Sequence, residues 1–231
     1  MAHAQTLPNH IAIIPDGNRR WARNHGLPTL EGHRRGVEVF ERIGDAALKR
    51  GVKYMTFYAF STENWSRSKR EVQYLVKLLH WVLTNKVKSL HEKNVKVNII
   101  GRMDALSADL RRHVAQAMDL TKENTRGVLN LAINYGGRPE LVDVVRSIVA
   151  HRYSAKQVTE ELINRELYTH GLPDPDLIIR TSGEQRLSNF LTWQSAYSEL
   201  YFVEKHWPSF TERDLDAALA EYAKRERRFG H

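Results

Sequence analysis

Hydrophobic residues in this chain occur as short continuous runs separated by longer segments of mixed polarity. The runs cover residues 11–14, 52–60, 95–100, 128–133 and 177–179, with a shorter one over 200–202. Continuous apolar runs of this length are typical of strands that are buried on both faces, which occur mainly in parallel sheets. The pattern therefore predicts a mainly parallel central sheet.

The segments between these runs carry apolar residues at helical spacing. They predict helices over residues 72–90, 110–118, 141–148 and 215–222. Ser107 is a suitable N-cap for the second of these helices, and Pro139 suits the first turn of the third. Strands and helices alternate along the whole chain without a repeat or a linker, which predicts an α/β fold with helices around the sheet, in one domain over residues 1–231.

Composition and charge narrow the class of protein. The chain has 42% hydrophobic and 27% charged residues and no cysteine, and no apolar stretch approaches the roughly 20 residues that span a bilayer. We therefore expect a cytoplasmic protein without disulfides, at most peripheral to a membrane. The net charge of +8 suits nucleic acid, an anionic membrane or strongly anionic small substrates, and equally a basic surface without a partner.

The loop after the first strand combines a turn with fixed positive charge. Asp16 and Gly17 are followed by Asn18, Arg19 and Arg20. Ligands of open α/β sheets bind at the carboxyl ends of strands, where paired arginines suit phosphate oxygens and an aspartate suits Mg²⁺. An ordinary Asp-Gly turn before a basic helix explains the same residues.

The loop after the second strand gathers varied polar groups beside an indole, in residues 61–67. Such loops commonly bind ligands. A helix start with Ser66 or Ser68 as N-cap and Glu71 in the first turn is an alternative that does not exclude binding. The glycines of the loop at residues 134–139 fit either a binding site or a plain turn.

The loop after the fifth strand carries Arg180, Arg186 and Ser188 and is a second candidate for a diphosphate cradle. Two arginine loops at strand ends predict two anionic groups in one cleft, whereas a nucleic-acid-binding protein would spread its cations along one face. The chain lacks the phosphate-loop and dinucleotide motifs, the His-Glu-x-x-His zinc motif and the Gly-x-Ser-x-Gly elbow. Glu199, farther along, would ordinarily be a surface or capping carboxylate.

Several of these segments together resemble the motifs of one enzyme family. Residues 10–22 resemble the opening motif of the cis-prenyltransferases, the undecaprenyl diphosphate synthase family. The same resemblance extends over residues 32–34, 58–65, 134–138, 176–190, 193–202 and 225–230. It covers essentially the whole chain.

The resemblance implies a sheet surrounded by helices with an elongated hydrophobic tunnel, usually in a homodimer. It also implies an Mg²⁺-dependent reaction in which isopentenyl diphosphate is condensed onto an allylic diphosphate, commonly farnesyl diphosphate, with cis double bonds. The expected product is a long-chain polyprenyl diphosphate such as undecaprenyl diphosphate, the precursor of a cell-wall lipid carrier. A short- or medium-chain synthase and a non-catalytic subunit of a heteromeric prenyltransferase are the alternatives. Peripheral membrane contact during product release is also expected, and nucleic acid is not an expected partner.

The resemblance also assigns roles to individual residues. Asp16 and Asn64 are the expected catalytic residues, with Asp16 at Mg²⁺ and Asn64 assisting proton removal. Glu199 is the expected second carboxylate near the metal. The expected substrate-binding residues are Gly17, Asn18, Arg19, Arg20, Trp21, His33, Ser61, Thr62, Glu63, Trp65, Arg67, Arg180, Arg186, Leu187 and Ser188, of which Arg180, Arg186 and Ser188 resemble the isopentenyl diphosphate site.

Three positions depart from the family pattern. Arg19 stands where many long-chain members have glycine, and Thr29 stands at about the place of a further arginine. We therefore expect Arg19 to supply the charge that Thr29 lacks. Val37 stands where long-chain members often carry a smaller residue, so the product length is left open.

Overall fold

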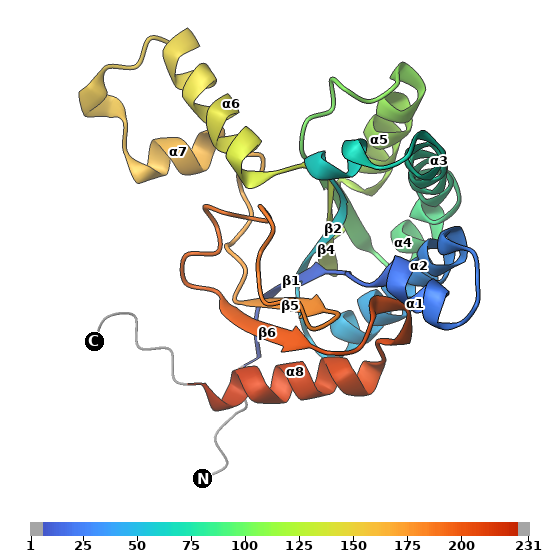
Figure 1. Cartoon of the computed structure of the whole chain (residues 1–231). Helices are drawn as coiled ribbons and strands as arrows, with labels where there is room; N and C mark the ends of the chain where they lie inside the picture. Colours follow the sequence, from blue (N-terminus) through green and yellow to red (C-terminus); the bar gives the residue numbers. More distant parts are fainter. Residues whose placement is uncertain (1–6, 226–231) are drawn as a thin grey trace.

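A computed structural model describes residues 7–225 of the chain. Its centre is one six-stranded sheet in the order β3-β4-β2-β1-β5-β6 (Figure 1), in which every neighbouring pair is parallel. The prediction of a parallel sheet built from six apolar runs is confirmed. The strands are β1 (His10–Ile14), β2 (Tyr54–Ser61), β3 (Val95–Ile100), β4 (Gly127–Tyr135), β5 (Leu177–Thr181) and β6 (Glu199–Val203).

The helices confirm most of the helical patterns and correct one. The pattern over residues 72–90 is not one helix, because the chain breaks at Lys86. Ser68, rather than Ser66, caps the first part by accepting from the Glu71 N–H, and Ser107 caps as predicted. The α-helices are α1 (Asn18–Asn24), α2 (Thr29–Lys49), α3 (Lys69–Asn85), α4 (Val87–Glu92), α5 (Ala108–Thr121), α6 (Gly137–Ala150), α7 (Glu160–Glu166) and α8 (Glu212–Lys224); the 3₁₀ turns are η1 (Thr62–Ser66), η2 (Ala155–Gln157) and η3 (Trp207–Ser209).

Helix α2 is the longest of the described helices, and the hydrophobic pattern did not predict it. Its buried face carries glycines and alanines beside few large apolar side chains. A Cβ at Gly32 would lie 2.0 Å from the backbone oxygen of Asn18, and one at Gly36 would lie 2.5 Å from the Asn18 Oδ1. The glycines therefore let α2 pack directly against α1, which holds the loop after β1 in place.

The two faces of the sheet are covered differently. Alternate residues such as Ile11 and Ile13 point into a large core with α2, α3, α4, α5 and α8. The residues between them, Ala12 and Ile14, point into a smaller core that Phe190 and Leu191 cover from the chain after β5. The prediction of a sheet surrounded by helices is confirmed, and loop residues such as Phe190 cover part of the second face.

A line of polar side chains crosses the sheet from the start of β1 to the middle of β3. His10 donates from Nδ1 to the Pro173 backbone oxygen at 2.7 Å and accepts at Nε2 from the Thr56 hydroxyl at 2.8 Å. Asn130 donates to Thr56 Oγ1 at 3.1 Å and accepts from the Asn98 amide at 3.2 Å. We call these four residues, His10, Thr56, Asn130 and Asn98, the polar ladder. It joins β1, β2, β4 and β3, so buried polar atoms of four strands satisfy one another.

Across residues 7–225, no helix combines the length and the apolar character that a membrane span requires.

Candidate active site

The loops after β1, β2 and β5 line two neighbouring polar pockets at the carboxyl edge of the sheet. The first pocket, of about 390 Å³, lies beside α1 and contains four arginines and one histidine among its lining residues. The second, of about 480 Å³, lies between the ends of β2 and β5. Both include Pro15, Asp16 and Arg67 in their walls. The sequence-based expectation of two anion sites in one cleft is consistent with this arrangement.

Asp16 lies where the two pockets meet, at the end of β1. Its Oδ2 accepts from Arg180 Nη2 at 2.9 Å, its Oδ1 accepts from the Gly17 N–H at 2.6 Å, and Arg20 lies 3.4 Å away. Burial alone would raise the pKa of the Asp16 carboxyl, but the Arg180 hydrogen bond and charge, the Gly17 N–H and the charge of Arg20 together lower it. The carboxylate is therefore ionised at neutral pH.

Gly17 makes the sharp turn that starts α1. Its φ is +95°, and a Cβ would lie 2.5 Å from Ser182 Oγ and 2.7 Å from His206 Nδ1. Ser182 Oγ and His206 Nδ1 are themselves 2.6 Å apart. The glycine is required by conformation and by contact. The Ser182–His206 pair beneath it was not predicted, because no motif in the sequence links the two positions.

Glu71 contacts three basic side chains of the first pocket, two arginines and one histidine. It accepts from Arg67 Nη1 at 2.9 Å and lies 3.4 Å from His33 Nε2 and 3.8 Å from Arg19. Burial, and then the charge of Arg67, lower the pKa of His33, so this ring is neutral at pH 7. The sequence marked Glu71 only as a first-turn capping residue, and its role in organising the pocket was missed.

Arg180 is the buried guanidinium of the second pocket. Nη1 donates to Ser188 Oγ at 2.7 Å and to the backbone oxygen of Arg186, while Nε has no protein partner among the described residues. A buried donor without a partner is costly unless something accepts from it. The geometry therefore suits an anion that accepts from Arg180.

The other residues of this loop are placed differently. The Arg186 side chain is 60% exposed and pairs with Glu184, which also pairs with Arg20. Leu187 packs partly buried against the smaller core. The structure thus brings Arg180 and Ser188 to Asp16, whereas the guanidinium of Arg186 lies on the rim of the cleft.

The loop after β2 contributes Ser61, Glu63 and Asn64 to the second pocket. Asn64 Oδ1 accepts from the Ser61 N–H at 3.1 Å, which leaves its amide nitrogen as the group that can contact a ligand. The Glu63 carboxylate accepts from Asn189 at 3.0 Å. Thr62 does not line either polar pocket.

The loop at residues 134–139, left open by its sequence, supports the others. Trp65 Nε1 donates to Asn134 Oδ1 at 2.7 Å. A Cβ at Gly137 would lie 2.2 Å from Thr192 Oγ1, so the glycine permits close packing there. Trp21 also has a supporting contact, because its Nε1 donates to Ser209 Oγ at 2.9 Å and its ring stacks on His25.

An apolar cavity of about 110 Å³ opens beside the first polar pocket. Pro15, Asn18 and His33 line both of these spaces. The cavity continues between α2, α3 and the sheet, and Phe40 lines both this cavity and a further chamber of about 490 Å³. A polar head at α1 could therefore be held with an apolar tail directed toward Phe40.

Glu199 lies at the other edge of the sheet. It starts β6 and pairs in register with Leu177 at the start of β5, whereas Ile14 pairs with Arg180 near the end of β5. Its Oε2 accepts from Arg225 at 2.7 Å. Within one chain, the structure therefore does not bring Glu199 together with Asp16. Residues 226–230 of the expected C-terminal motif lie outside the described residues.

Asp16 fits the requirements of a magnesium ligand. Mg²⁺ in phosphate-transfer sites takes one or two carboxylates and completes its shell with substrate phosphate oxygens and water. The ionised Asp16 carboxylate is 31% exposed and faces both polar pockets. It can hold the ion only if a substrate oxygen or water replaces part of its pairing with Arg180 and Arg20.

Comparison with known proteins places this site in a family. A family model described as putative undecaprenyl diphosphate synthase matches residues 14–230. Proteins named isoprenyl transferase are 48% identical in Thermotoga maritima, over 97% of both chains, and 51% identical in Brucella suis, over 96% of this chain and 89% of the relative. The chain therefore belongs to the undecaprenyl diphosphate synthase family of cis-prenyltransferases.

Two solved structures share the fold. Lavandulyl diphosphate synthase from Lavandula x intermedia, in complex with dimethylallyl diphosphate, is 38% identical with a TM-score of 0.94 over 97% of this chain and 99% of its own. A probable undecaprenyl diphosphate synthase from Campylobacter jejuni is 30% identical with a TM-score of 0.82 over 98% and 100%. The protein is thus an isoprenyl transferase, an enzyme of cis-prenyl chain condensation.

Proposed function

We propose that the enzyme joins an allylic diphosphate, with farnesyl diphosphate as the primer, to isopentenyl diphosphate. The allylic diphosphate occupies the first pocket, and isopentenyl diphosphate occupies the second, at Arg180 and Ser188. The observation that carries this assignment is the position of the apolar cavity, which shares Asn18 and His33 with the first pocket, whereas neither residue lines the second. Only the allylic substrate needs room for a growing hydrocarbon tail.

The chemistry follows from where charge develops. The allylic C–O bond breaks, and its electron pair leaves on the diphosphate. The double bond of isopentenyl diphosphate forms the new C–C bond, and loss of a proton from C2 of that unit gives the cis double bond. Arg20, Arg67 and the α1 turn stabilise the departing diphosphate more strongly than the bound ester, because negative charge accumulates on it in the transition state.

Mg²⁺, held by Asp16 and substrate oxygens, would supply further positive charge to the leaving diphosphate. Asp16 itself orients Arg180 and so links the two pockets. We do not include Glu199 in this ligand set, since its place at the other edge of the sheet offers no support for it.

Asn64 acts by positioning in this proposal. Its carbonyl oxygen already accepts from the Ser61 N–H, so its amide N–H groups face the pocket as donors. An amide donor can hold a diphosphate oxygen, and that oxygen is the stronger base for the departing proton. In this proposal Asn64 assists proton removal by orienting the diphosphate oxygen that accepts the proton.

The product is proposed to be a long-chain polyprenyl diphosphate such as undecaprenyl diphosphate. The family model described as putative undecaprenyl diphosphate synthase and the probable undecaprenyl diphosphate synthase of Campylobacter jejuni support this length. The second candidate, a short- or medium-chain product, is favoured by Phe40. Its ring lies 4.4 Å from that of Phe57, and it stands between the apolar cavity and the further chamber, both of which it lines. Product sizing distinguishes the two.

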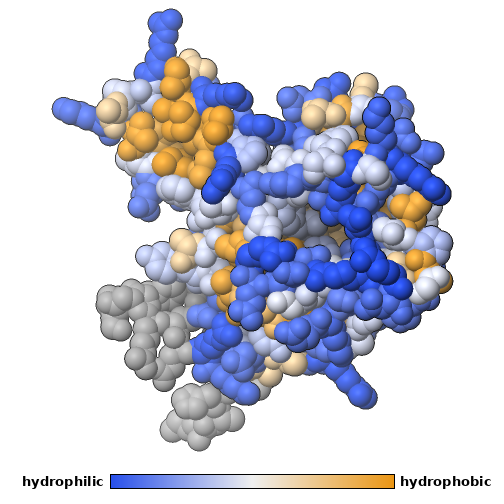
Figure 2. Space-filling model, in the orientation of Figure 1, coloured by the Kyte–Doolittle hydropathy of each residue, from blue (hydrophilic) through white to orange (hydrophobic). Residues whose placement is uncertain are grey.

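The assembly is proposed to be a homodimer in the cytoplasm that releases its product at a membrane surface. Helix α6 leaves Val142, Val145 and Val149 exposed, the last by 70%, and Figure 2 shows hydrophobic residues gathered over the part of the molecule formed by α6 and α7. An apolar patch of this kind favours burial against another protein surface. The net charge of +8 would favour contact with anionic lipids.

The decisive experiment uses the full chain with farnesyl diphosphate, labelled isopentenyl diphosphate and Mg²⁺. Diphosphate release and labelled prenyl products are expected from the wild type, and a loss of at least 100-fold from Asp16→Ala. The proposal fails if no allylic primer yields diphosphate release, or if Asp16→Ala and the wild type behave alike.

A further inference from the structure

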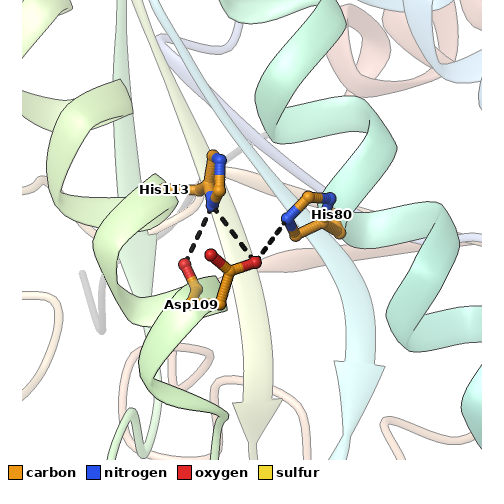
Figure 3. A group of neighbouring side chains, drawn as sticks. All are labelled: His80, Asp109 and His113. Atoms are coloured by element: carbon orange, nitrogen blue, oxygen red, sulfur yellow. Dashed lines mark hydrogen bonds and ion pairs between the residues drawn. The ribbon is translucent and has the colours of Figure 1, made fainter.

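Two histidines and one aspartate converge between helices α3 and α5. His80 projects from α3, and Asp109 and His113 project from α5 toward it (Figure 3). Each offers one ligand atom within 4.8 Å of the other two. None of the three lines the two polar pockets or the apolar cavity, so the proposed reaction leaves this cluster without a role.

Both histidines lie close to one carboxylate oxygen of Asp109. His80 Nε2 lies 2.8 Å from Asp109 Oδ2, and His113 Nδ1 lies 3.8 Å from the same oxygen. The two imidazole rings are 4.4 Å apart between centroids, in an edge-to-face arrangement. Asp109 and His113 are four residues apart on one helix, which places them on the same face.

We propose that His80, Asp109 and His113 form a binding site for a divalent transition metal of the zinc class. Two imidazoles and one carboxylate are the donor set that Zn²⁺, Ni²⁺ and Co²⁺ prefer, whereas Mg²⁺ prefers oxygen ligands. Three protein ligands leave one position for water or another ligand. The site is therefore chemically different from the one at Asp16.

The geometry needs little adjustment. Metal–nitrogen distances of about 2.0–2.1 Å in a tetrahedral site place ligand atoms roughly 3.4 Å apart. The side chains of His80 and Asp109 are 38% and 51% exposed, so they can move by the remaining ångström. Arg112, which pairs with Asp109, is itself 62% exposed and can turn away into solvent.

His113 presents Nδ1 to the cluster. This nitrogen lies 3.8 Å from Asp109 Oδ2 and 2.8 Å from the backbone oxygen of Asp109. As a metal ligand it would give up the hydrogen bond to that backbone oxygen, and the ring would carry its proton on Nε2. The neutral imidazole then offers its Nδ1 lone pair to the ion.

The bound ion would connect two helices with different roles. Helix α3 supplies Leu75, Leu78, Leu79 and Val82 to the wall of the apolar cavity, and α5 packs against β3. A metal between them would hold α3 against the body of the protein and oppose any outward movement of that wall. This consequence rests on the proposed function, whereas metal binding does not.

Binding is tested on the metal-stripped full chain by titration calorimetry with ZnCl₂ and by the visible spectrum with CoCl₂, without diphosphate. If His80, Asp109 and His113 form the site, the affinity for Zn²⁺ is expected to be at least tenfold weaker in His80→Ala and in His113→Ala. It is expected to persist in Asp16→Ala and in His91→Ala, an exposed histidine of α4 and a matched control. Circular dichroism shows that each variant is folded.

Asp109→Asn provides a second variant that keeps both imidazoles. It is expected to weaken Zn²⁺ binding and to change the Co²⁺ spectrum. The proposal is overturned if His80→Ala and His113→Ala bind Zn²⁺ as the wild type does, or if only Asp16→Ala abolishes binding. Because these experiments measure metal binding and not activity, a negative result would not contradict the proposed condensation reaction. A negative result in the activity assay would likewise not contradict the metal site.

Discussion

Arg180 and Asp16 are 164 residues apart in the sequence and form an ion pair of 2.9 Å between Nη2 and Oδ2. They meet because β5 lies beside β1 with Ile14 in register with Arg180. The pair stands between the two polar pockets. A change in how one pocket is occupied therefore alters the charge that faces the other.

Arg180→Lys should separate charge from geometry at this pair. Lysine keeps the positive charge but cannot contact Asp16, Ser188 and the Arg186 carbonyl together. We expect kcat/KM for isopentenyl diphosphate to fall about 100-fold, roughly 2.7 kcal/mol of transition-state stabilisation. Steady-state diphosphate release measures this, with Arg126→Lys at an exposed position as the control. A loss below threefold would contradict the assignment.

Glu71→Gln should expose the repulsion that Glu71 relieves. Without its negative charge, Arg67 and Arg19 lose the carboxylate that both of them contact. Because Arg67 is 29% and Arg19 51% exposed, we expect only about 2 kcal/mol less stability rather than the larger cost of a fully buried pair.

Inorganic diphosphate should restore part of that loss, since an anion in the first pocket replaces the missing charge. Thermal unfolding with and without diphosphate checks this. The shift in midpoint should be larger in Glu71→Gln than in the wild type. Equal shifts would show that Glu71 does not organise the anion pocket.

Arg19→Ala tests whether this arginine replaces the one that the family often has near Thr29. Arg19 is half exposed, so we expect diphosphate affinity to fall only about fivefold, roughly 1 kcal/mol. Adding Thr29→Arg to that variant should recover most of the affinity. Calorimetric titration of both variants with an allylic diphosphate measures the effect, and no change in either would refute the compensation.

Phe40→Ala should lengthen the products. Removing the ring joins the 110 Å³ apolar cavity to the 490 Å³ chamber beyond it. The cost in stability should stay below about 3 kcal/mol, because Phe40 is only partly buried. Chromatographic sizing of labelled products is the measurement, with Arg35→Ala on the exposed face of α2 as the control. Unchanged product length would place the limit elsewhere.

His10 should make stability depend on pH between 7 and 5. Burial lowers the pKa of His10 to about 4, against a raising contribution from the Pro173 hydrogen bond. The folded state therefore holds the neutral ring, and protonation of the unfolded chain below its pKa of about 6.5 favours unfolding. The contribution is fully present above pH 6.5 and is lost as pH falls toward 4.

From pH 7 to 5 this single group should remove about 2 kcal/mol from the free energy of unfolding. His10→Gln, which does not titrate, should lose less over the same interval. Urea unfolding at the two pH values compares the slopes. Parallel slopes in the two proteins would mean that the buried histidine is not the cause.

Local patterns predicted the strands well because strands buried on both faces must be apolar along their whole length. The hydrophobic pattern did not predict α2, because its contact face depends on Gly32 and Gly36. Glycine is required there for its small size and adds nothing to a periodic pattern of large apolar residues. The helix predicted over residues 72–90 is interrupted at Lys86, although no proline or glycine stands there. Helix breaks of this kind are set by packing and not by propensity.

The sequence predicted which loops form the site, but it did not predict which side chains of those loops contact one another. Asp16 and Arg180 each stood out at a strand end, and only the strand order reveals that they touch. His206 was missed because its contact with Ser182 joins distant positions, and Glu71 because two of its three partners, His33 and Arg19, lie far away in sequence. Glu199 was expected beside Asp16 by resemblance, and the register of β6 places it at the opposite edge.

The polar ladder has a consequence for folding accuracy. Strands such as β1 and β4 are apolar on both faces, so a pairing shifted by one residue would still bury hydrophobic side chains. A shift would, however, leave His10, Thr56 and Asn130 without partners inside the core, at a cost of about 1–3 kcal/mol for each orphaned group. The polar ladder therefore destabilises shifted strand pairings and favours the register in which the two pockets lie side by side.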